Sequence, residues 1–281
     1  TTEIYTLSLH DALPIYLIKY YDLALDAQNT SICIAGDVSK ESAIDKFNSL
    51  EKKLKKKGTV VKLPEKFNSY QSSKLYFIDF PGARQSEIRI GSLGTSFTDP
   101  DYFKTTVMNY KLGGSFNSFV NLILREEKGY TYGARTGFTG YEYPGYFVAN
   151  AGVQTNATLE SVEIFRDEMN KYRNGISDDD LKFTKDALIK SNALRFETIG
   201  ALRGMLTQII KYDLPFNYIK LQEKQIEEMT FDEHKMLAQK YINPDKMIYL
   251  VAGDKETQFE QLKKLGLGEP ILLDKNGSEI K

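Results

Sequence analysis

Apolar segments in the middle of the chain predict β-strands. Residues 74–80 form an almost continuous apolar run that stops at Pro81-Gly82, which is typical of a buried strand. Residues 86–91 instead alternate apolar and polar side chains, as a half-exposed strand does. By the same criteria, further strands are predicted over residues 130–138, 145–153 and 247–252.

Apolar residues at helical spacing predict helices between these strands. Asp99-Pro100 is a typical helix start, and Gly113-Gly114 marks the predicted end of that helix. Ser115 is the predicted cap of a second helix, which ends at Lys128-Gly129. Further helices are predicted over 158–173, from a capping box at 177–180 to residue 212 with a break near 200, and after a second capping box at 230–233.

The order of these elements predicts the fold class. Strands follow one another directly and helices come in runs, so the pattern argues against a regular alternation of strand and helix. We therefore predict an α+β fold, in which helices pack on one face of a mostly antiparallel sheet.

A segment near the start of the chain resembles a segment near its end. Residues 19–37 carry Lys-Tyr, a polar loop, an apolar strand-like run and Ala-Gly-Asp, and residues 240–254 carry the same order at an offset of 254 − 37 = 217 residues. An offset of domain size predicts two copies of one domain, of which the first is present only as its C-terminal remnant. The predicted boundaries are a remnant at 16–58, a linker at 59–73, a complete domain at 74–267 and a polar tail at 268–281.

Composition and charge exclude several classes of protein. The chain has 281 residues, of which 41% are hydrophobic and 27% charged, and its net charge of −1 gives no sign of a nucleic-acid-binding surface. The one basic run, at 52–57, is predicted to be a solvated helix end. No apolar stretch reaches the roughly 20 residues that span a bilayer, so we predict no membrane insertion.

The first residues are left out of the fold prediction. Residues 6–15 resemble a translated frame of a sequencing adapter, so residues 1–15 are predicted to be an artefact, or else a polar leader. A start of this kind leaves the localisation of the protein open.

Cysteine and histidine are too scarce to build a catalytic metal site. Cys33, the only cysteine, lies in an apolar run and is predicted to be a small buried hydrophobe. Histidine occurs only at His10 and His234, whereas a zinc hydrolase site normally takes three protein ligands, prominently imidazoles. We predict that this chain alone binds no zinc, and that Glu233-His234 lies on a solvated helix face.

The strongest functional signal lies between residues 112 and 133. Leu-Gly-Gly-Ser-Phe-Asn-Ser at 112–118, followed by Leu-Arg-Glu-Glu-Lys-Gly-Tyr-Thr-Tyr-Gly at 124–133, resembles the C-terminal domain of the insulinase (pitrilysin) metallopeptidases, a family that includes mitochondrial processing peptidases. The resemblance extends over about residues 16–265. It implies two homologous α+β domains around a closed chamber, with zinc bound by an H-x-x-E-H motif of the first domain. That motif is absent from this sequence.

The resemblance also implies site residues. The family's second domain contributes an arginine and a tyrosine, which match Arg125 and Tyr132, and both side chains can donate hydrogen bonds to a peptide carbonyl and its oxyanion. From spacing alone, Arg125 could instead pair with local carboxylates and Tyr132 could pack in the sheet. Tyr130 is a second candidate for the phenol, because two residues along a strand share a face. Phe138 and the aromatic residues after it either contact substrate side chains or fill the sheet face.

Two functions are compatible with these features. The resemblance implies the C-terminal part of a zinc metalloendopeptidase that cleaves peptides or unfolded segments, with zinc, its ligands and the general base supplied by a missing first domain or a partner chain. The alternative is a non-catalytic family member that binds peptides or serves as a structural partner subunit. The presence of both Arg125 and Tyr132 favours the peptidase.

Overall fold

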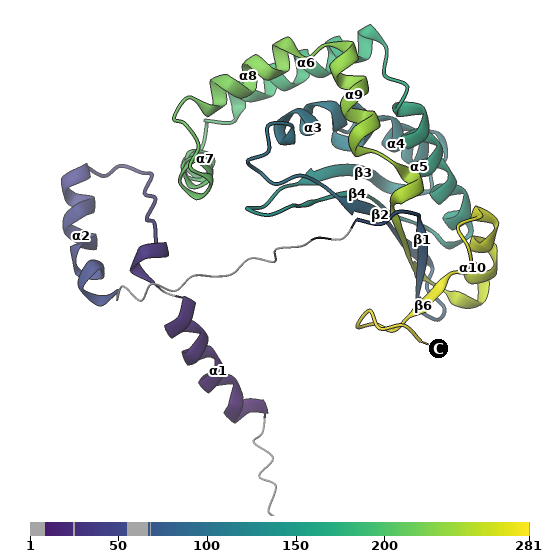
Figure 1. Ribbon diagram of the computed structural model, residues 1–281, viewed down its shortest axis with the longest axis horizontal. Helices are drawn as coiled ribbons and strands as arrows, with labels where there is room; N and C mark the ends of the chain where they lie inside the picture. Colours follow the sequence, from purple (N-terminus) through teal and green to yellow (C-terminus); the bar gives the residue numbers. More distant parts are fainter. Residues whose placement is uncertain (1–8, 25, 55–66, 68, 281) are drawn as a thin grey trace, which may run out of the picture. The chain divides into compact units, whose positions relative to one another are not determined.

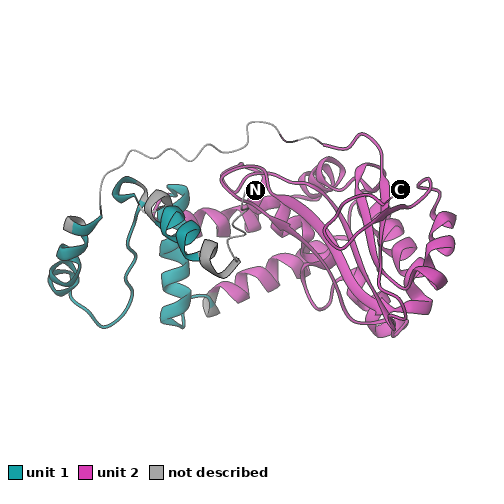
Figure 2. Ribbon diagram, turned by 90° about the horizontal axis from the view of Figure 1, so that it is seen from below, with its two compact units in different colours: residues 1–63, 195–214 teal, residues 64–194, 215–281 magenta. Residues whose placement is uncertain are grey.

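The computed structural model describes residues 9–24, 26–54, 67 and 69–280. The chain divides into two compact units, one of residues 1–63 with 195–214 and the other of residues 64–194 with 215–281 (Figure 2). The second unit contains the sheet, whereas α7 (Ile199–Tyr212) groups with the first unit and not with the rest of the predicted 74–267 domain. Of the predicted linker at 59–73, residues 59–66 and 68 lie outside the described residues.

The second unit is built on one mixed sheet, and all five predicted strands of this unit are confirmed. The described strands run in the order β3-β4-β2-β5-β1-β6. Antiparallel pairs join β3, β4, β2 and β5 in turn, while β1 pairs in parallel with β5 and with β6. Their bounds are β1 Lys74–Asp79, β2 Gln85–Leu93, β3 Thr131–Thr139, β4 Tyr146–Gln154, β5 Ile248–Gly253 and β6 Ile271–Leu273.

Two features of the sheet differ from the prediction. Strand β6 lies in the segment that we predicted to be a polar tail, and it was missed because it is only three residues long. Strands β1 and β2 follow one another in sequence but are not neighbours, because β5 lies between them and pairs with both. Local sequence patterns do not predict that a strand from far along the chain lies between β1 and β2.

Helices cover one face of the sheet, as predicted (Figure 1). Helix α5 contacts β2 and β4, α3 contacts β3, and α10 contacts β1. Short π-helical turns follow α3 and α4 at Tyr110–Gly114 (η2) and Leu122–Glu127 (η3). The helices of this unit are α3 Tyr102–Asn109, α4 Phe119–Asn121, α5 Thr158–Tyr172, α6 Asp178–Leu194, α8 Tyr218–Glu228, α9 Phe231–Tyr241 and α10 Lys255–Leu262.

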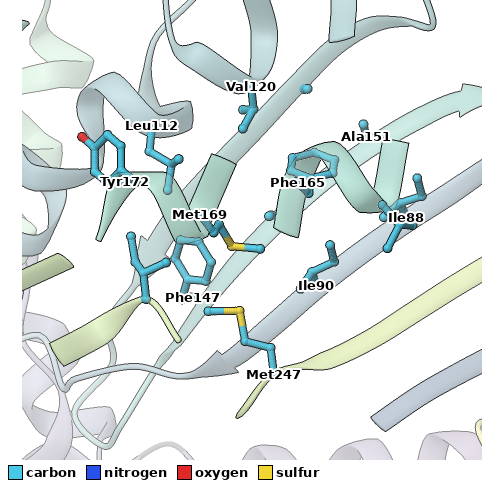
Figure 3. Close-up of a cluster of buried hydrophobic side chains, with 14 of the residues drawn as sticks. Ile88, Ile90, Leu112, Val120, Phe147, Ala151, Phe165, Met169, Tyr172 and Met247 are labelled. Carbon is cyan, nitrogen blue, oxygen red and sulfur yellow. The ribbon is translucent and has the colours of Figure 1, made fainter. Parts of the chain in front are cut away.

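The hydrophobic core lies between the sheet and these helices (Figure 3). Alternate residues of each strand point into it, so that Ile88 and Ile90 of β2 are fully buried while Arg89 between them is exposed. Each fully buried aliphatic or aromatic side chain contributes roughly 1.5–3 kcal/mol. Other members of the core are Phe77, Met108, Leu112, Val120, Phe147, Phe165, Met169 and Tyr249.

Both predicted capping boxes are confirmed, but two helices begin later than predicted. The Ser177 and Thr230 hydroxyls each accept a bond from the amide three residues on, at 3.1 Å. Helix α3 begins at Tyr102, because Asp99 accepts a bond from the Asp101 amide at 2.8 Å and so closes a turn ahead of the helix. Helix α4 begins after Ser118, three residues beyond the predicted cap at Ser115.

The repeat found in the sequence is present in the structure. In the first unit, Asp26 caps the 3₁₀ turn η1 (Ala27–Asn29), and in the second unit Asn243 caps η5 (Pro244–Lys246), an offset of 243 − 26 = 217 residues. Helices flank both turns: α1 (Leu9–Ala24) and α2 (Lys40–Lys53) in the first copy, α9 and α10 in the second. Residues 9–15 of the predicted leader thus belong to α1, and residues 1–8 lie outside the described residues.

The predicted strand of the first copy is not formed. Residues 31–37 have no strand structure, whereas their counterpart β5 pairs on both sides. A strand is stable only when its backbone groups are paired, and the described residues of the first unit include no strand beside this segment. The prediction for Cys33 is also wrong, because the residue is only half-buried, with its thiol 3.9 Å from the Arg203 carbonyl oxygen.

Candidate functional site

Arg125 lies in the π-helical turn that precedes β3. The carbon of its guanidinium group is 4.5 Å from the centroid of the Phe116 ring, and its Nε is 3.5 Å from a carboxylate oxygen of Glu126. The side chain is 37% exposed, so the ion pair is of the solvated kind that contributes about 0–1 kcal/mol. The predicted alternative, pairing with a local carboxylate, is therefore present, but it leaves most of the guanidinium donors available.

A buried asparagine holds this turn against the strand. Asn121 donates to the Phe116 carbonyl at 2.7 Å, and its side-chain oxygen accepts from the Ala134 amide at 3.0 Å. It therefore joins the segment under Arg125 to the start of β3. Asn121 is not among the residues predicted for the site, although an asparagine inside the apolar run Phe-Val-Asn-Leu-Ile-Leu could have indicated a buried polar role.

Tyr132 is almost fully exposed. Gly129 ends the preceding turn with φ +66°, and the chain then enters β3 through a register shift between Thr131 and Ala134. Within this irregular stretch Tyr132 is 91% exposed. Its side chain makes no hydrogen bond and no ring contact with any described residue, so the ring does not pack in the sheet.

Tyr130 does not share the surroundings of Tyr132, so the expectation that the two phenols lie on one face is wrong, while a substrate contact by Tyr130 stays a prediction. Tyr130 precedes β3 and packs partly against the core, and its phenol donates to Glu160 of α5 at 2.7 Å. This hydrogen bond raises the pKa of Tyr130, while hydrogen bonds from Lys128 and Tyr130 lower the pKa of Glu160. The register shift removes the strict alternation on which the prediction depended.

Phe138 lies toward the other end of β3. Its ring centroid is 4.9 Å from that of the buried Phe147 and 6.3 Å from that of Tyr241, so it fills the sheet face. Of the aromatic residues that follow, Tyr141 and Tyr143 stack on each other and Tyr146 is 42% exposed. A substrate contact by Phe138 stays a prediction, and its packing does not favour it.

Gly113 permits close contact between the helix layer and β3. A Cβ atom on Gly113 would lie 2.3 Å from the Thr136 nitrogen, and the φ angle of Gly113 is not positive. The helical segment ends at Gly114, as predicted, but Gly113 serves this close approach and not a left-handed turn. Beside it, Asn109 and Thr136 exchange two hydrogen bonds, of 2.8 and 2.6 Å, which fix this approach.

His234 is buried, and the prediction of a solvated position is wrong. Its Nε2 lies 3.1 Å from the Tyr172 hydroxyl and 3.2 Å from the Met108 carbonyl oxygen. Because the Tyr172 proton goes to the Met108 oxygen, the Nε2 atom must carry the histidine proton, and Nδ1 has no partner among the described residues. Burial lowers the pKa of His234 to about 4, so the ring is neutral at pH 7.

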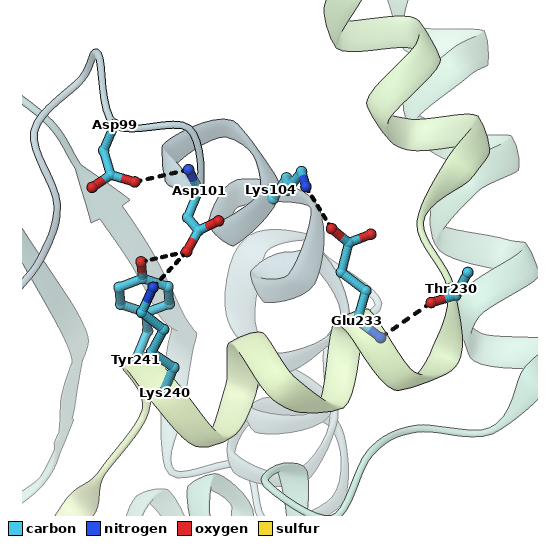
Figure 4. Close-up of polar contacts among 7 residues, drawn as sticks. All are labelled: Asp99, Asp101, Lys104, Thr230, Glu233, Lys240 and Tyr241. Carbon is cyan, nitrogen blue, oxygen red and sulfur yellow. Dashed lines mark hydrogen bonds and ion pairs between the residues drawn. The ribbon is translucent and has the colours of Figure 1, made fainter.

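The packing of α9 on α3 explains why Glu233 forms an ion pair while the next residue, His234, is buried (Figure 4). Glu233 forms an ion pair with Lys104, while Lys240 and Tyr241 both donate to Asp101 at 2.7 Å. The hydrogen bond from Lys240 is the main cause of the lowered pKa of Asp101. His234, one position after Glu233, points into the core between these contacts.

The described residues do not fit a metal site. No three His, Cys, Asp or Glu side chains within them lie close enough together to hold a metal ion. None of the described helices is both long and apolar enough to cross a membrane.

Comparison with known proteins places this geometry in a family. The family model described as the peptidase M16 inactive domain matches residues 16–188. Among curated proteins, the probable inactive metalloprotease YmfF of Bacillus subtilis is 25% identical over 67% of the chain, and the uncharacterized zinc protease SCO5738 of Streptomyces coelicolor is 29% identical over 43% of it. The chain spans 43% and 27% of the length of these two relatives.

Solved structures agree with this match. An M16 inactive domain from Pseudomonas fluorescens superimposes with a TM-score of 0.69 at 28% identity, covering 78% of this chain and 52% of that one. A protease from Helicobacter pylori gives a TM-score of 0.72 at 14% identity, with coverages of 88% and 59%, and shows the likeness of fold alone. The resemblance and the fold class predicted from the sequence are both confirmed.

Proposed function

Since the chain belongs to the peptidase M16 inactive domain family, we propose that it forms the half of a zinc peptidase that holds the substrate but not the metal. In this proposal Arg125 and Tyr132 contact the scissile peptide. The observation that carries it is Tyr132, an aromatic residue that is 91% exposed and without a partner in the described chain. Both its ring and its hydroxyl are therefore accessible to a ligand.

The chemistry follows from the donors that these two residues provide. The Tyr132 hydroxyl and the Arg125 guanidinium can donate to the carbonyl oxygen of the peptide that is cleaved. Such bonds strengthen as negative charge develops on that oxygen, so they stabilise the transition state more than the substrate. The Phe116 ring limits the motion of Arg125, and Asn121 fixes Phe116 relative to β3.

The zinc ion and the general base would come from another domain or chain. Zinc is named for the Streptomyces relative, and the described residues here do not fit a zinc site. The proposal therefore requires a zinc-bearing family domain as partner and a peptide or unfolded segment as substrate.

Mutation in the reconstituted enzyme tests the two roles. Removal of one donor to an oxyanion typically lowers kcat by about 10²–10³, so Tyr132→Phe and Arg125→Ala should each do so with a smaller effect on KM. Tyr143→Phe and Arg84→Ala are the matched controls. Unchanged kcat in Tyr132→Phe and Arg125→Ala would rule out this assignment.

A non-catalytic function is the second candidate. The Bacillus relative is named a probable inactive metalloprotease, which favours a role as a peptide-binding or structural partner subunit. The two functions differ in one assay. If a quenched peptide is cleaved only after this chain is mixed with a zinc-bearing family partner, the mixture is a two-chain peptidase. If cleavage by the partner is unaffected by the chain, the non-catalytic function holds.

A further inference from the structure

A groove lies along the side of the sheet that faces away from the core. Residues between the buried positions of the strands form its floor, among them Val148 of β4 and Ile248 and Leu250 of β5. The segment Ser69–Gln71 and the chain after α9 form its walls. Its volume is about 590 Å³, within the range of roughly 300–1,000 Å³ typical of ligand pockets. We call this feature the sheet groove.

The sheet groove is lined by cations and by no carboxylate among the described residues. The three cations are Arg89 from β2, Lys240 from the end of α9 and Lys246 from η5. The chain as a whole has a net charge of −1, so this one-sided lining is a local feature and not a consequence of composition.

The three cations differ in how much of their charge is already paired with acidic residues of this chain. Lys240 donates to Asp101, and Arg89 uses its Nε to contact Glu87 at 3.3 Å. Both acids lie outside the groove lining, and the terminal guanidinium nitrogens of Arg89 make no contact with described residues. Lys246 is exposed and forms no ion pair with any described residue. The groove therefore has unbalanced positive charge beside an apolar floor.

We propose that the sheet groove binds an acidic segment of a peptide. An apolar side chain of the peptide would lie on Val148, Ile248 and Leu250, and a neighbouring carboxylate would contact Lys246 and the free side of Arg89. This inference deepens the proposed function, on which it rests only for the choice of a peptide as the ligand. It adds a preference in substrate charge at a surface that does not include Arg125 or Tyr132.

The apolar floor independently favours a peptide over other anions. Nucleic-acid grooves combine rows of cations with stacked aromatic residues. Only three cations line this groove, and its floor at Val148, Ile248 and Leu250 is aliphatic. The aromatic residues that also line it form no ring contact with one another: Tyr70, Tyr146, Phe147 and Tyr241. An isolated small anion would leave the aliphatic strip uncovered. A peptide with alternating apolar and acidic residues satisfies both halves of the groove.

Binding of labelled peptides to the 281-residue chain tests the proposal without zinc or catalysis. Three fluorescent peptides would share one Leu-Phe core and carry Glu, Gln or Lys residues on both sides. Fluorescence anisotropy should give about tenfold tighter binding for the Glu peptide than for the Lys peptide, and the difference should shrink at high salt. Lys246→Glu should weaken binding of the Glu peptide by about tenfold.

Lys220→Glu is the control, because Lys220 is an exposed residue of α8 with no ion pair to a described residue and its replacement changes the net charge equally. Equal binding of the Glu and Lys peptides would overturn the proposal, as would equal effects of the two variants. Stronger binding of a short oligothymidylate than of the Glu peptide would also overturn it. Each of these results leaves the kcat test of Arg125 and Tyr132 intact, so the two proposals can fail separately.

Discussion

Single residues set how closely the helices approach β3. Gly113 lies where any side chain would collide with Thr136, and Asn109 bonds that same threonine twice. The Gly-Gly pair was recognisable in the sequence, but its role was not. In the sequence, a glycine that ends a helix cannot be distinguished from one that allows a helix to approach a strand closely, because the position of the strand is not known.

A methyl group at Gly113 should therefore be costly. Gly113→Ala should lower the free energy of unfolding by about 1–3 kcal/mol or more, because the new Cβ overlaps the Thr136 backbone. Gly137→Ala is the control, since a Cβ there meets nothing within 4 Å. Urea denaturation of both variants measures the difference, and equal losses would show that the close approach is not required.

His234 should make the fold sensitive to acid. Its pKa of about 4 lies below the ordinary value of about 6.5, so between these pH values the unfolded chain binds a proton that the folded chain does not. Stability should therefore rise with pH from about 4 to 6.5, with His234 contributing up to about 3 kcal/mol of this change. Urea unfolding at several pH values should show a flatter profile for His234→Gln than for the native protein. Parallel profiles would contradict the assignment.

At the scale of elements, one sequence pattern has two outcomes. The apolar run ending in Ala-Gly-Asp forms β5 in the second copy and no strand in the first. The helices and the capped 3₁₀ turn form in both copies, because their hydrogen bonds are local. The strand forms only where β1 and β2 are present to pair with it.

Hydrogen exchange should separate the two copies. Amides of β5 are paired on both sides and should exchange roughly 10³-fold or more slowly than those of residues 31–35. Mass spectrometry of peptic fragments resolves both segments in one experiment. Similar protection of the two segments would contradict the absence of a strand in the first copy.

The contact between α9 and α3 should also be measurable. Asp101→Asn removes the negative charge that Lys240 and Tyr241 contact and leaves only a neutral amide oxygen as acceptor. It should cost about 1 kcal/mol at pH 7, a modest value because Lys240 is 55% exposed. The pKa of Asp101 is lowered in the folded state, so its stabilising contribution is complete above the unfolded pKa and is lost as pH falls. Asp245→Asn is the control, and an equal cost for both variants in urea unfolding would contradict this role.

Local patterns predicted the strands of the sheet, the capping boxes and the helix-covered face, because periodicity and caps depend on nearby residues. They did not predict that β5 separates β1 from β2, that β6 exists, or that His234 is buried next to Glu233, which forms an ion pair with Lys104. Each of these depends on an element far away in the sequence. For the candidate site, the sequence indicated Arg125 and Tyr132 but not Asn121, which connects their supports.

At the scale of the whole molecule, the two proposals assign different tasks to two surfaces of one unit. The turn before β3 would act on the bond that is cleaved, and the sheet groove would hold a neighbouring acidic segment. Contacts with a substrate segment far from the cleaved bond change KM, whereas hydrogen bonds to the oxyanion change kcat.

Kinetics of the reconstituted enzyme can separate these tasks. With an acidic substrate, Lys246→Glu should raise KM by about tenfold and leave kcat nearly unchanged, while Tyr132→Phe should lower kcat. The double variant should show the sum of both free-energy effects, as expected for independent sites. A strong departure from additivity would mean that the groove and the turn act as one site.

The position of β5 has a further consequence for how the protein is made. Lys74 of β1 pairs with Ile248, so the sheet closes across a sequence separation of 248 − 74 = 174 residues. During synthesis β1 and β2 leave the ribosome long before the strand that separates them, and their inner edges stay unpaired until β5 arrives. Such long-range closure makes folding slow and exposes strand edges to aggregation. A nascent chain stalled before residue 248 should therefore need chaperones to stay soluble. Once β5 has left the ribosome and paired with β1 and β2, that need should end.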